Sequence, residues 1–326
     1  MKIKEWFRKL VAGLAIGTGA AIPGVSGAAI AVIFHVYEDI INAVNNFRKK
    51  FGWAITVLIP ILIGIIIAVI ICIILFKLAF KYLMFVLMCV FAGFLIGSFP
   101  GITDEVKGEK PTKLNIVLII IGALFVVGLG IASVLSGLNV KVLFEQMPWW
   151  LYLVLVPVGA VAAVALTVPG LSGSLILLII GFYRPLVDFV GEWAKQMLKG
   201  DFTHTGHLFG VLGCFAVGCL IGVILVSKIM NILLKKWRKQ TFYTIIGFIA
   251  GSVFVLFFNF NIYSYYQAWA GIPQEDISQV LPMWLEIIIG LCVLALCAFL
   301  SYRLVVAQRK RIETKEEENY EGLPQG

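Results

Sequence analysis

The eight-residue stretch AIPGVSGA (21–28) interrupts an apolar segment near the start of this chain, and a second copy interrupts another. The second copy reads TVPGLSGS (167–174) and follows the first after 146 residues. In each copy a tyrosine, Tyr37 or Tyr183, comes ten residues after the second glycine. A proline and two glycines disfavour a continuous helix. Broken helices at corresponding positions in two halves of a membrane protein are typical of a transport site.

The composition places the chain in a bilayer. Of its 326 residues, 61% are hydrophobic and 13% are charged, and the mean hydropathy is +1.00. A soluble domain is about 25% charged. The net charge of +8 comes from lysines and arginines that flank apolar spans, which indicates orientation in a membrane and no nucleic-acid partner. The six cysteines lie in apolar runs without metal-ligand spacing, so we expect neither a metal nor another cofactor.

The apolar runs predict an all-α integral membrane protein with two repeats, each a re-entrant helical hairpin followed by three transmembrane helices. A re-entrant form is favoured because a limb from Leu10 to Ile22 spans only about 20 Å, whereas the hydrocarbon core is roughly 30 Å thick. After each break we expect one continuous helix, over 28–45 and 172–190. The expected segments are a first repeat, 1–140, with hairpin 10–45 and spans 53–76, 82–100 and 114–135; a second repeat, 141–305, with hairpin 150–190 and spans 208–230, 241–260 and 283–303; and a polar, disordered cytoplasmic tail, 306–326.

The topology follows from counting crossings. A hairpin adds no net crossing and three spans add an odd number, so the two repeats are expected to have inverted topology. A G-F-x-x-G-S element in the second span of each half, at 93–98 and 247–252, extends the repeat beyond the hairpins. With both termini cytoplasmic, 20 of the 26 lysines and arginines fall on the cytoplasmic side. This distribution agrees with the positive-inside rule and predicts a multi-pass plasma-membrane protein.

The two breaks are the predicted anion site. At the start of a helix the first N–H groups lack helical acceptors, and together with the helix dipole they favour an anion such as phosphate. Glycine allows close backbone approach, and serine hydroxyls add donors. We expect phosphate contacts from both breaks and their flanks: Thr18, Gly24, Val25, Ser26, Gly27, Thr167, Gly170, Leu171, Ser172, Gly173 and Ser174.

Charged residues near the hairpins form a second predicted set. Glu38 and Arg184 each lie twelve residues beyond a motif serine, which on a straight helix is roughly 18 Å from the break. They are expected to guard opposite mouths, with Lys77 and Lys81 joining Arg184 in capturing a head group on the outer side. Asp188, four residues after Arg184, can pair with it on one helix face. Glu38, Asp39 and His35 are candidates for proton coupling. Interfacial polar side chains without a transport role remain the alternative for each of these residues.

The hairpin motifs P-G-[VL]-S-G, the run from Gly17 to Gly27 and the G-F-x-x-G-S elements resemble the PopT family of polytopic bacterial membrane proteins. The resemblance covers nearly the whole chain except the tail. It implies a transporter, not an enzyme, that moves undecaprenyl phosphate, the lipid carrier of cell-wall synthesis, from the outer to the inner leaflet for recycling. The positions carried over by motif are 23–27 and 169–173, followed by Arg184 and Glu38. The implied partners are this lipid and the bilayer, and a homo-oligomer remains an option.

Two other functions remain open. Undecaprenyl-pyrophosphate phosphatases also have inverted re-entrant hairpins with a P-G-x-S motif, but their serine is followed by an arginine. Here Ser26 is followed by Gly27 and Ser172 by Gly173, which disfavours lipid phosphatase chemistry. An inorganic-anion channel or exchanger is the other alternative, because chloride transporters also use broken helices with Gly-Ser-Gly sequences.

Overall fold

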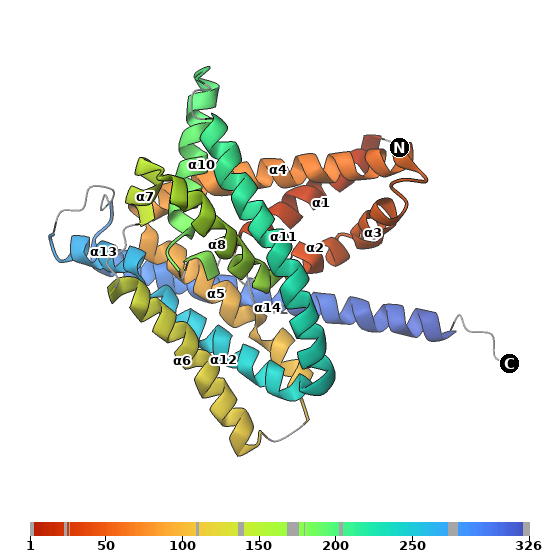
Figure 1. Cartoon of the computed structure of the whole chain (residues 1–326). Helices are drawn as coiled ribbons and strands as arrows, with labels where there is room; N and C mark the ends of the chain where they lie inside the picture. Colours follow the sequence, from red (N-terminus) through yellow and green to blue (C-terminus); the bar gives the residue numbers. More distant parts are fainter. Residues whose placement is uncertain are drawn as a thin grey trace.

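The chain folds into an assembly of helices without a strand in the part that the structure describes (Figure 1). This computed structural model describes residues 3–22, 25, 27–108, 111–135, 140–167, 176–178, 180–201, 205–272 and 280–321. The helices are α1 (Ile3–Ala21), α2 (Gly27–Ile33), α3 (Tyr37–Asn45), α4 (Phe51–Tyr82), α5 (Met84–Thr103), the 3-10 turn η1 (Asp104–Val106), α6 (Lys113–Leu135), α7 (Val140–Gln146), α8 (Trp149–Thr167), α10 (Tyr183–Leu198), α11 (Thr205–Lys236), α12 (Arg238–Leu256), α13 (Phe260–Trp269) and α14 (Met283–Glu321).

Six helices among the described residues are long and apolar enough to cross a bilayer. They cover Phe51–Tyr82, Met84–Val106, Lys113–Ala132, Thr205–Lys236, Arg238–Leu256 and Met283–Lys310. About 20 apolar residues suffice for one crossing. The six predicted spans are therefore confirmed, and the protein is an all-α, multi-pass membrane protein.

Two predicted boundaries were wrong. The segment 77–81, expected as a connection, is helical, and α4 continues to Tyr82 because no glycine or proline ends it earlier. Only Leu83, with φ −142° and ψ 46°, separates α4 from α5. The tail 306–326 was expected to be disordered, but α14 extends to Glu321. Its glutamates, lysines and arginines are good helix formers that prolong a helix already started in the membrane.

The hairpin limbs pack on the first span of their own half. Helix α1 lies along α4, and α8 lies along α11. A Cβ at Gly13 would lie 2.2 Å from the Ile61 carbonyl oxygen, and a Cβ at Gly159 would lie 2.2 Å from the Phe215 carbonyl oxygen. The same close contact thus recurs in both halves, and in each pair the limb begins beside the start of its partner. Small residues allow this backbone approach, as expected in membranes.

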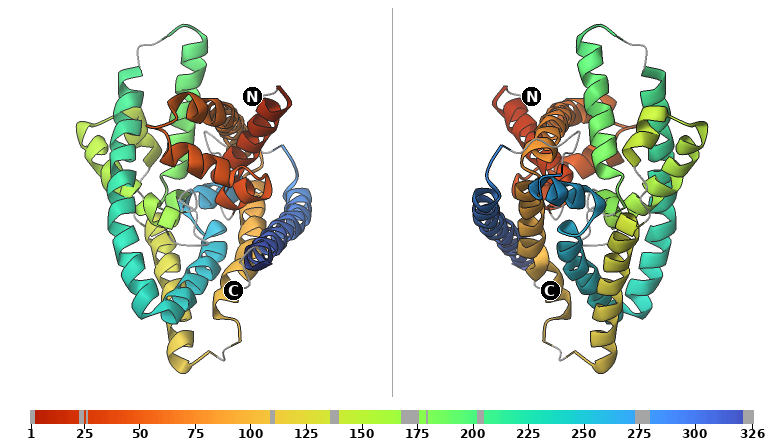
Figure 2. Two further views of the ribbon diagram at one scale, coloured as in Figure 1. Left: turned by 90° about the vertical axis from the view of Figure 1, so that its right-hand side faces the viewer. Right: turned by 90° about the vertical axis from the view of Figure 1, so that its left-hand side faces the viewer.

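The third spans pack on the opposite half. Helix α14 lies along α5 and α6 lies along α12, as Figure 2 shows. The glycines of the two G-F-x-x-G-S elements form both contacts. A Cβ at Gly93 would meet the Leu294 carbonyl oxygen at 2.5 Å, and one at Gly247 would meet the Ile119 carbonyl oxygen at 2.1 Å. The halves therefore interlock by exchanging their last spans, which the sequence analysis did not predict.

Each hairpin contains a turn where a continuous helix was predicted. His35 at φ 56° separates α2 from α3, and Gly181 at φ 83° precedes α10. The hydrogen bonds match at a displacement of 146: Val36 N–H donates to the Ala31 carbonyl at 3.0 Å, and Phe182 N–H donates to the Leu177 carbonyl at 2.9 Å. In the second half Pro185, in the first turn of α10, would clash with residue 181 inside a continuous helix. In the first half Glu38 and Asp39 occupy the first turn of α3, where the helix dipole favours acidic residues.

The charged residues gather at two ends of the assembly. The Arg238 end comprises the start of α12, the end of α5 with η1, and the part of α14 around Arg309, which ion pairs join to one another. There Arg238 pairs with Glu105 at 2.5 Å, and Arg309 pairs with Asp104. The Lys77 end holds Lys77, Tyr82, Glu192 and Met283. The membrane side that each end faces stays a prediction.

Candidate functional site

Most of the predicted anion site lies outside the described residues. This applies to Pro23, Gly24 and Ser26 in the first break and to all of 168–175 in the second, with Gly170, Leu171, Ser172, Gly173 and Ser174. Thr167 ends α8, and its side chain is likewise outside the description. Phosphate binding by these residues therefore stays a prediction.

The described flanks of the first break form two packed limbs. Helix α1 ends at Ala21, and α2 begins at Gly27 and packs back against α1. Val25 N–H donates to the Ile22 carbonyl oxygen at 3.3 Å, which makes a turn between the limbs. The Thr18 hydroxyl donates to the Leu14 carbonyl oxygen at 2.9 Å within α1. Because that proton is engaged, Thr18 would have to rotate before it could donate to a phosphate oxygen.

Tyr183 joins the flanks of the two breaks. Its hydroxyl donates to the carbonyl oxygen of Ala21, the last residue of α1, at 3.3 Å. The ring is 8% exposed and packs near Phe76, Phe80 and Phe91. Leu177 and Leu178, which follow the second break, share one core cluster with residues 21 and 22. The Tyr183 contact therefore places the start of α10 against the end of α1.

Tyr183 is a site residue that the sequence analysis noted but gave no role. Its repeated position, ten residues after the second glycine, was the available signal. The equivalent Tyr37 is 43% exposed. Because both tyrosines occupy the same position in the repeated sequence, the pattern alone could not show which of them is buried. The final α1 carbonyls lack helical donors, which explains why a hydroxyl donor is useful at Ala21.

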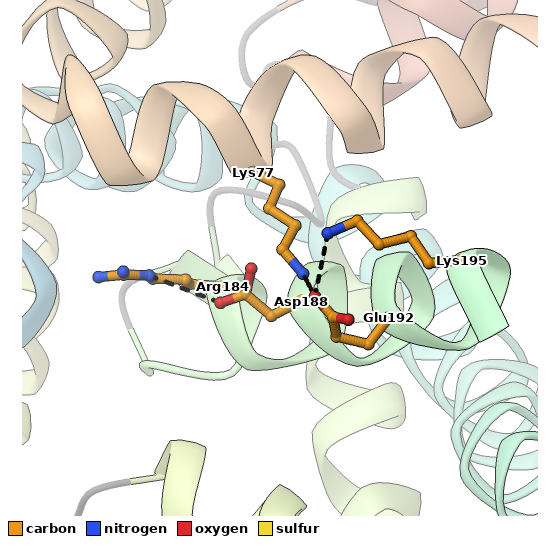
Figure 3. A network of polar contacts seen from close by, with 5 residues as sticks. All are labelled: Lys77, Arg184, Asp188, Glu192 and Lys195. Atoms are coloured by element: carbon orange, nitrogen blue, oxygen red, sulfur yellow. Dashed lines mark hydrogen bonds and ion pairs between the residues drawn. The ribbon is translucent and has the colours of Figure 1, made fainter. Parts of the chain in front are cut away.

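Arg184 and Lys77 each pair with a carboxylate on α10 (Figure 3), and their joint capture of a head group stays a prediction. Arg184 Nε lies 3.7 Å from Asp188 Oδ2, which confirms the expected pairing on one helix face. The Arg184 guanidinium also lies over the Phe80 ring, 5.7 Å from its centroid. Lys77 reaches across from α4 to pair with Glu192 on α10. Lys81 instead stacks over the Tyr82 ring at 5.2 Å and is not part of this network.

The network has more cations than carboxylates. It contains three cations, Lys77, Arg184 and Lys195, and two carboxylates, Asp188 and Glu192. Lys77 and Lys195, whose Nζ lies 3.3 Å from Glu192 Oε1, hold the pKa of Glu192 below its usual range. The Arg184 side chain is only 14% exposed, so its charge acts in a partly dehydrated environment. A phosphate group could replace a carboxylate on Arg184 with a comparable fork of hydrogen bonds.

The proposed proton-coupling residues lie around the turn between α2 and α3. Asp39 Oδ2 forms an ion pair with Lys9 Nζ at 2.9 Å, and Lys9 is 7% exposed. Asp39 thereby ties α3 to α1. His35 adopts the left-handed conformation of the turn, and Glu38 is exposed on the first turn of α3. The distance of roughly 18 Å from each break to Glu38 or Arg184 assumed one straight helix. That assumption was wrong, because turns at His35 and Gly181 lie between each break and these residues.

Three comparisons place this arrangement among known proteins. A family model described as undecaprenyl phosphate translocase-like matches residues 16–273. A polyprenyl-phosphate transporter from Staphylococcus aureus (strain NCTC 8325 / PS 47) is 30% identical over 260 residues, which cover 78% of this chain and 86% of the relative. A polyprenyl-phosphate transporter from Vibrio cholerae serotype O1 (strain ATCC 39315 / El Tor Inaba N16961) is 25% identical over 266 residues, covering 77% and 78% of the two chains. No solved structure shows a significant match.

Proposed function

This chain belongs to the undecaprenyl phosphate translocase-like family, and from that premise we propose that it transports a polyprenyl phosphate lipid across the bacterial plasma membrane. The proposed direction is from the outer to the inner leaflet, which returns the lipid carrier for reuse. The proposal assigns transport and no chemical step to the protein. It has two parts, a pair of inverted repeats and a phosphate site at the two hairpin breaks.

Recurring contacts support the inverted repeats. The corners before α5 and α12 have nearly identical dihedral angles, φ −142° and ψ 46° at Leu83 and φ −139° and ψ 46° at Trp237. The limb α1 begins beside the start of α4, at the Arg238 end, whereas α8 begins beside the start of α11, at the other end. Two hairpins that enter from opposite ends give a site that each leaflet can reach in turn.

The hydrogen bond from Tyr183 to the Ala21 carbonyl carries the site proposal. It holds the flank of one break against the other, so a single phosphate can contact both. In this arrangement the backbone N–H groups at 24–27 and 170–174 bind the phosphate, with Ser26 and Ser172 as further donors. The long apolar tail of the lipid stays in the bilayer and needs no polar site.

Capture of the head group precedes that binding. Arg184 and Lys77 lie at the α4–α10 contact near Tyr183, and we assign them the first contact with the phosphate in the outer leaflet. Arg184 then releases Asp188 while it binds the anion. The charge distribution supports this orientation, with the Lys77 end facing outward and both termini facing the cytoplasm.

A reconstituted system tests the proposal. Purified protein in liposomes should move a fluorescent polyprenyl phosphate between leaflets, measured by its protection from an impermeant quencher. The paired change Ser26→Ala with Ser172→Ala, or Arg184→Ala alone, should slow this movement at least about tenfold, the effect of losing about 1.4 kcal/mol of stabilisation. Unchanged rates in folded variants would remove the site assignment.

The same liposomes separate the two alternatives. Release of inorganic phosphate from a pyrophosphate lipid would identify a phosphatase. Entry of chloride or phosphate without lipid movement would identify an anion channel or exchanger. Lipid movement without either signal supports the transporter.

A further inference from the structure

Glu286 is a buried carboxyl group inside a membrane-spanning helix. It lies in the first turn of α14, at the Lys77 end, and is 1% exposed. It belongs to the span Met283–Lys310. An ionisable side chain at such a position is costly to bury and usually has a role in ion or proton movement. The sequence analysis did not identify it.

The Tyr265 hydroxyl faces two hydrogen-bond acceptors, the Glu286 carboxyl group and the Tyr82 carbonyl, but has a single proton to donate. The Tyr265 hydroxyl oxygen lies 2.8 and 3.0 Å from the two Glu286 carboxyl oxygens and 3.1 Å from the Tyr82 carbonyl oxygen. A tyrosine hydroxyl has one proton to donate. If Glu286 is charged, Tyr265 donates to it and the Tyr82 carbonyl, at the end of α4, loses that donor. If Glu286 carries a proton, both acceptors can be served.

No cation compensates a charge on Glu286. Among the described residues, no lysine, arginine or histidine forms an ion pair with it. The nearest lysine in sequence to this contact, Lys81, is directed over the Tyr82 ring. The titratable groups that interact with the carboxyl are Cys89 on α5 and Tyr265 on α13, neither of them cationic. The N–H groups of Phe85 and Val86, at the start of α5, are directed at the carboxyl and can hold its charged form.

We propose that Glu286 is a proton-binding site that switches between two hydrogen-bonded states. In the charged state, the Tyr265 O–H donates to the carboxylate. When one proton arrives from water at the Lys77 end, it binds a carboxyl oxygen; the new Glu286 O–H donates to the Tyr265 oxygen, and the Tyr265 O–H turns to the Tyr82 carbonyl. Release of the proton reverses both changes. The proton count balances, and no other bond changes.

The position equivalent to Glu286 in the other half carries no carboxyl group. The pairs Leu294 with Ile119 and Ala298 with Ala123 make equivalent contacts in the exchanged spans, a displacement of 175 residues. That displacement places Pro111 at the position equivalent to Glu286. The position equivalent to Glu286 near the Trp237 corner therefore carries no carboxyl group, and we expect the protonation of Glu286 to follow the pH at the Lys77 end.

The position of the site suggests how a proton would act on transport, and this step rests on the proposed function. Tyr82 ends the helix that carries Phe80 and Lys77. Phe80 lies beneath the Arg184 guanidinium and beside Tyr183. A change in the donor to the Tyr82 carbonyl therefore acts on the last turn of α4, two residues from the ring against which Arg184 packs.

Infrared difference spectroscopy tests the site without any lipid substrate. The protein in liposomes is titrated from acidic to alkaline pH, and the carbonyl stretch of a protonated carboxyl group is followed. We expect the Glu286 component of this band, obtained as the difference between the wild type and Glu286→Gln, to disappear as the pH rises, because the other carboxyl groups of the chain absorb in both proteins. Glu105→Gln, an exposed carboxyl paired with Arg238 at the other end, serves as the matched control and should retain the band.

Transport measured in parallel separates the two proposals. Wild-type lipid movement should depend on the pH on the Lys77 side, whereas Glu286→Gln should show no dependence on that pH. A titrating band in a protein that moves no lipid would leave the proton site intact and overturn the proposed function. Lipid movement in the wild type together with carboxyl bands that titrate identically in the wild type and in folded Glu286→Gln would overturn the proton site. Tyr265→Phe should shift the band, since it removes the partner of the carboxyl group.

Discussion

At the scale of single residues, the two repeats use equivalent positions differently. Tyr183 is buried and donates to the Ala21 carbonyl oxygen, whereas Tyr37 is exposed on α3. Arg184 packs over Phe80, whereas the equivalent Glu38 is exposed. The repeated sequence thus occurs in two different surroundings. Only the second copy has a tyrosine that is buried and bonded to the end of α1, through Tyr183 and Ala21.

Removal of the Tyr183 hydroxyl should weaken that contact. Tyr183→Phe loses the hydrogen bond to Ala21 and keeps the ring among its aromatic neighbours. We expect a stability loss of about 1 kcal/mol and slower lipid movement, measured by thermal unfolding and in the liposome assay. Tyr37→Phe is the matched control and should leave both unchanged. Equal effects of the two variants would contradict a special role for Tyr183.

Glu192 should give the protein a measurable pH dependence. Its pKa is lowered by Lys77 and Lys195, so it stabilises the folded protein above the pKa that it has in the unfolded chain. That contribution is lost as the pH falls below about 4.3 and through the lowered folded value. Because the side chain is 53% exposed, the effect is well below about 1 kcal/mol.

The measurement is the melting temperature of wild type and Glu192→Gln over a pH series. The wild type should be the more stable protein at neutral pH, and the difference should shrink in acid. Lys195→Met, which removes the more exposed partner, should have a smaller effect than Lys77→Met. A difference that grows as the pH falls would show that the ion pair does not stabilise the fold.

At the scale of helices, glycine and carbonyl groups decide which helices pair. Each G-F-x-x-G-S element places two glycines on one face, four residues apart, and each face receives the last span of the other half. Hydropathy identifies the spans because it depends only on local composition. The pairing depends on backbone fit between helices far apart in the sequence, which local composition does not contain.

A methyl group at such a contact should separate the helices. Gly247→Ala places a Cβ 2.1 Å from the Ile119 carbonyl oxygen, and backbone atoms cannot give way cheaply. We expect a loss of about 1–3 kcal/mol, measured as a lower unfolding temperature in detergent. Gly128→Ala, on α6 itself but facing open space, is the control and should be neutral or slightly stabilising. Equal stability of both variants would contradict the contact between α12 and α6.

At the scale of the whole molecule, the exchanged spans tie the two halves together. Neither half keeps its third span to itself, so a repeat cannot move as a rigid body without its partner's last helix. The hairpins, by contrast, pack mainly on the first span of their own half. The interlocked pairs α5–α14 and α6–α12 therefore join the two halves, while α1 and α8 pack along the first span of their own half.

The orientation of this assembly can be measured directly. Single cysteines replace Lys107 and Lys199, both exposed, in a variant without the six native cysteines. An impermeant maleimide added to intact cells should label position 199 and should reach position 107 only after the membrane is opened. Labelling in the reverse order would contradict the predicted orientation while leaving the described fold unchanged.

The sequence by itself determined the six spans, the repeated hairpin motif and the clustering of the charges, because each depends on local composition or on direct repetition. It also contained Pro185, which disfavours a continuous helix through residue 181. Only the tertiary structure decided that the last spans exchange partners, that Tyr183 and not Tyr37 is buried against the other hairpin, and that Glu286 lies beside Tyr265 and the Tyr82 carbonyl. These features require groups up to about two hundred residues apart to meet with matching shape and hydrogen bonds, and no local pattern in the chain specifies which of them do so.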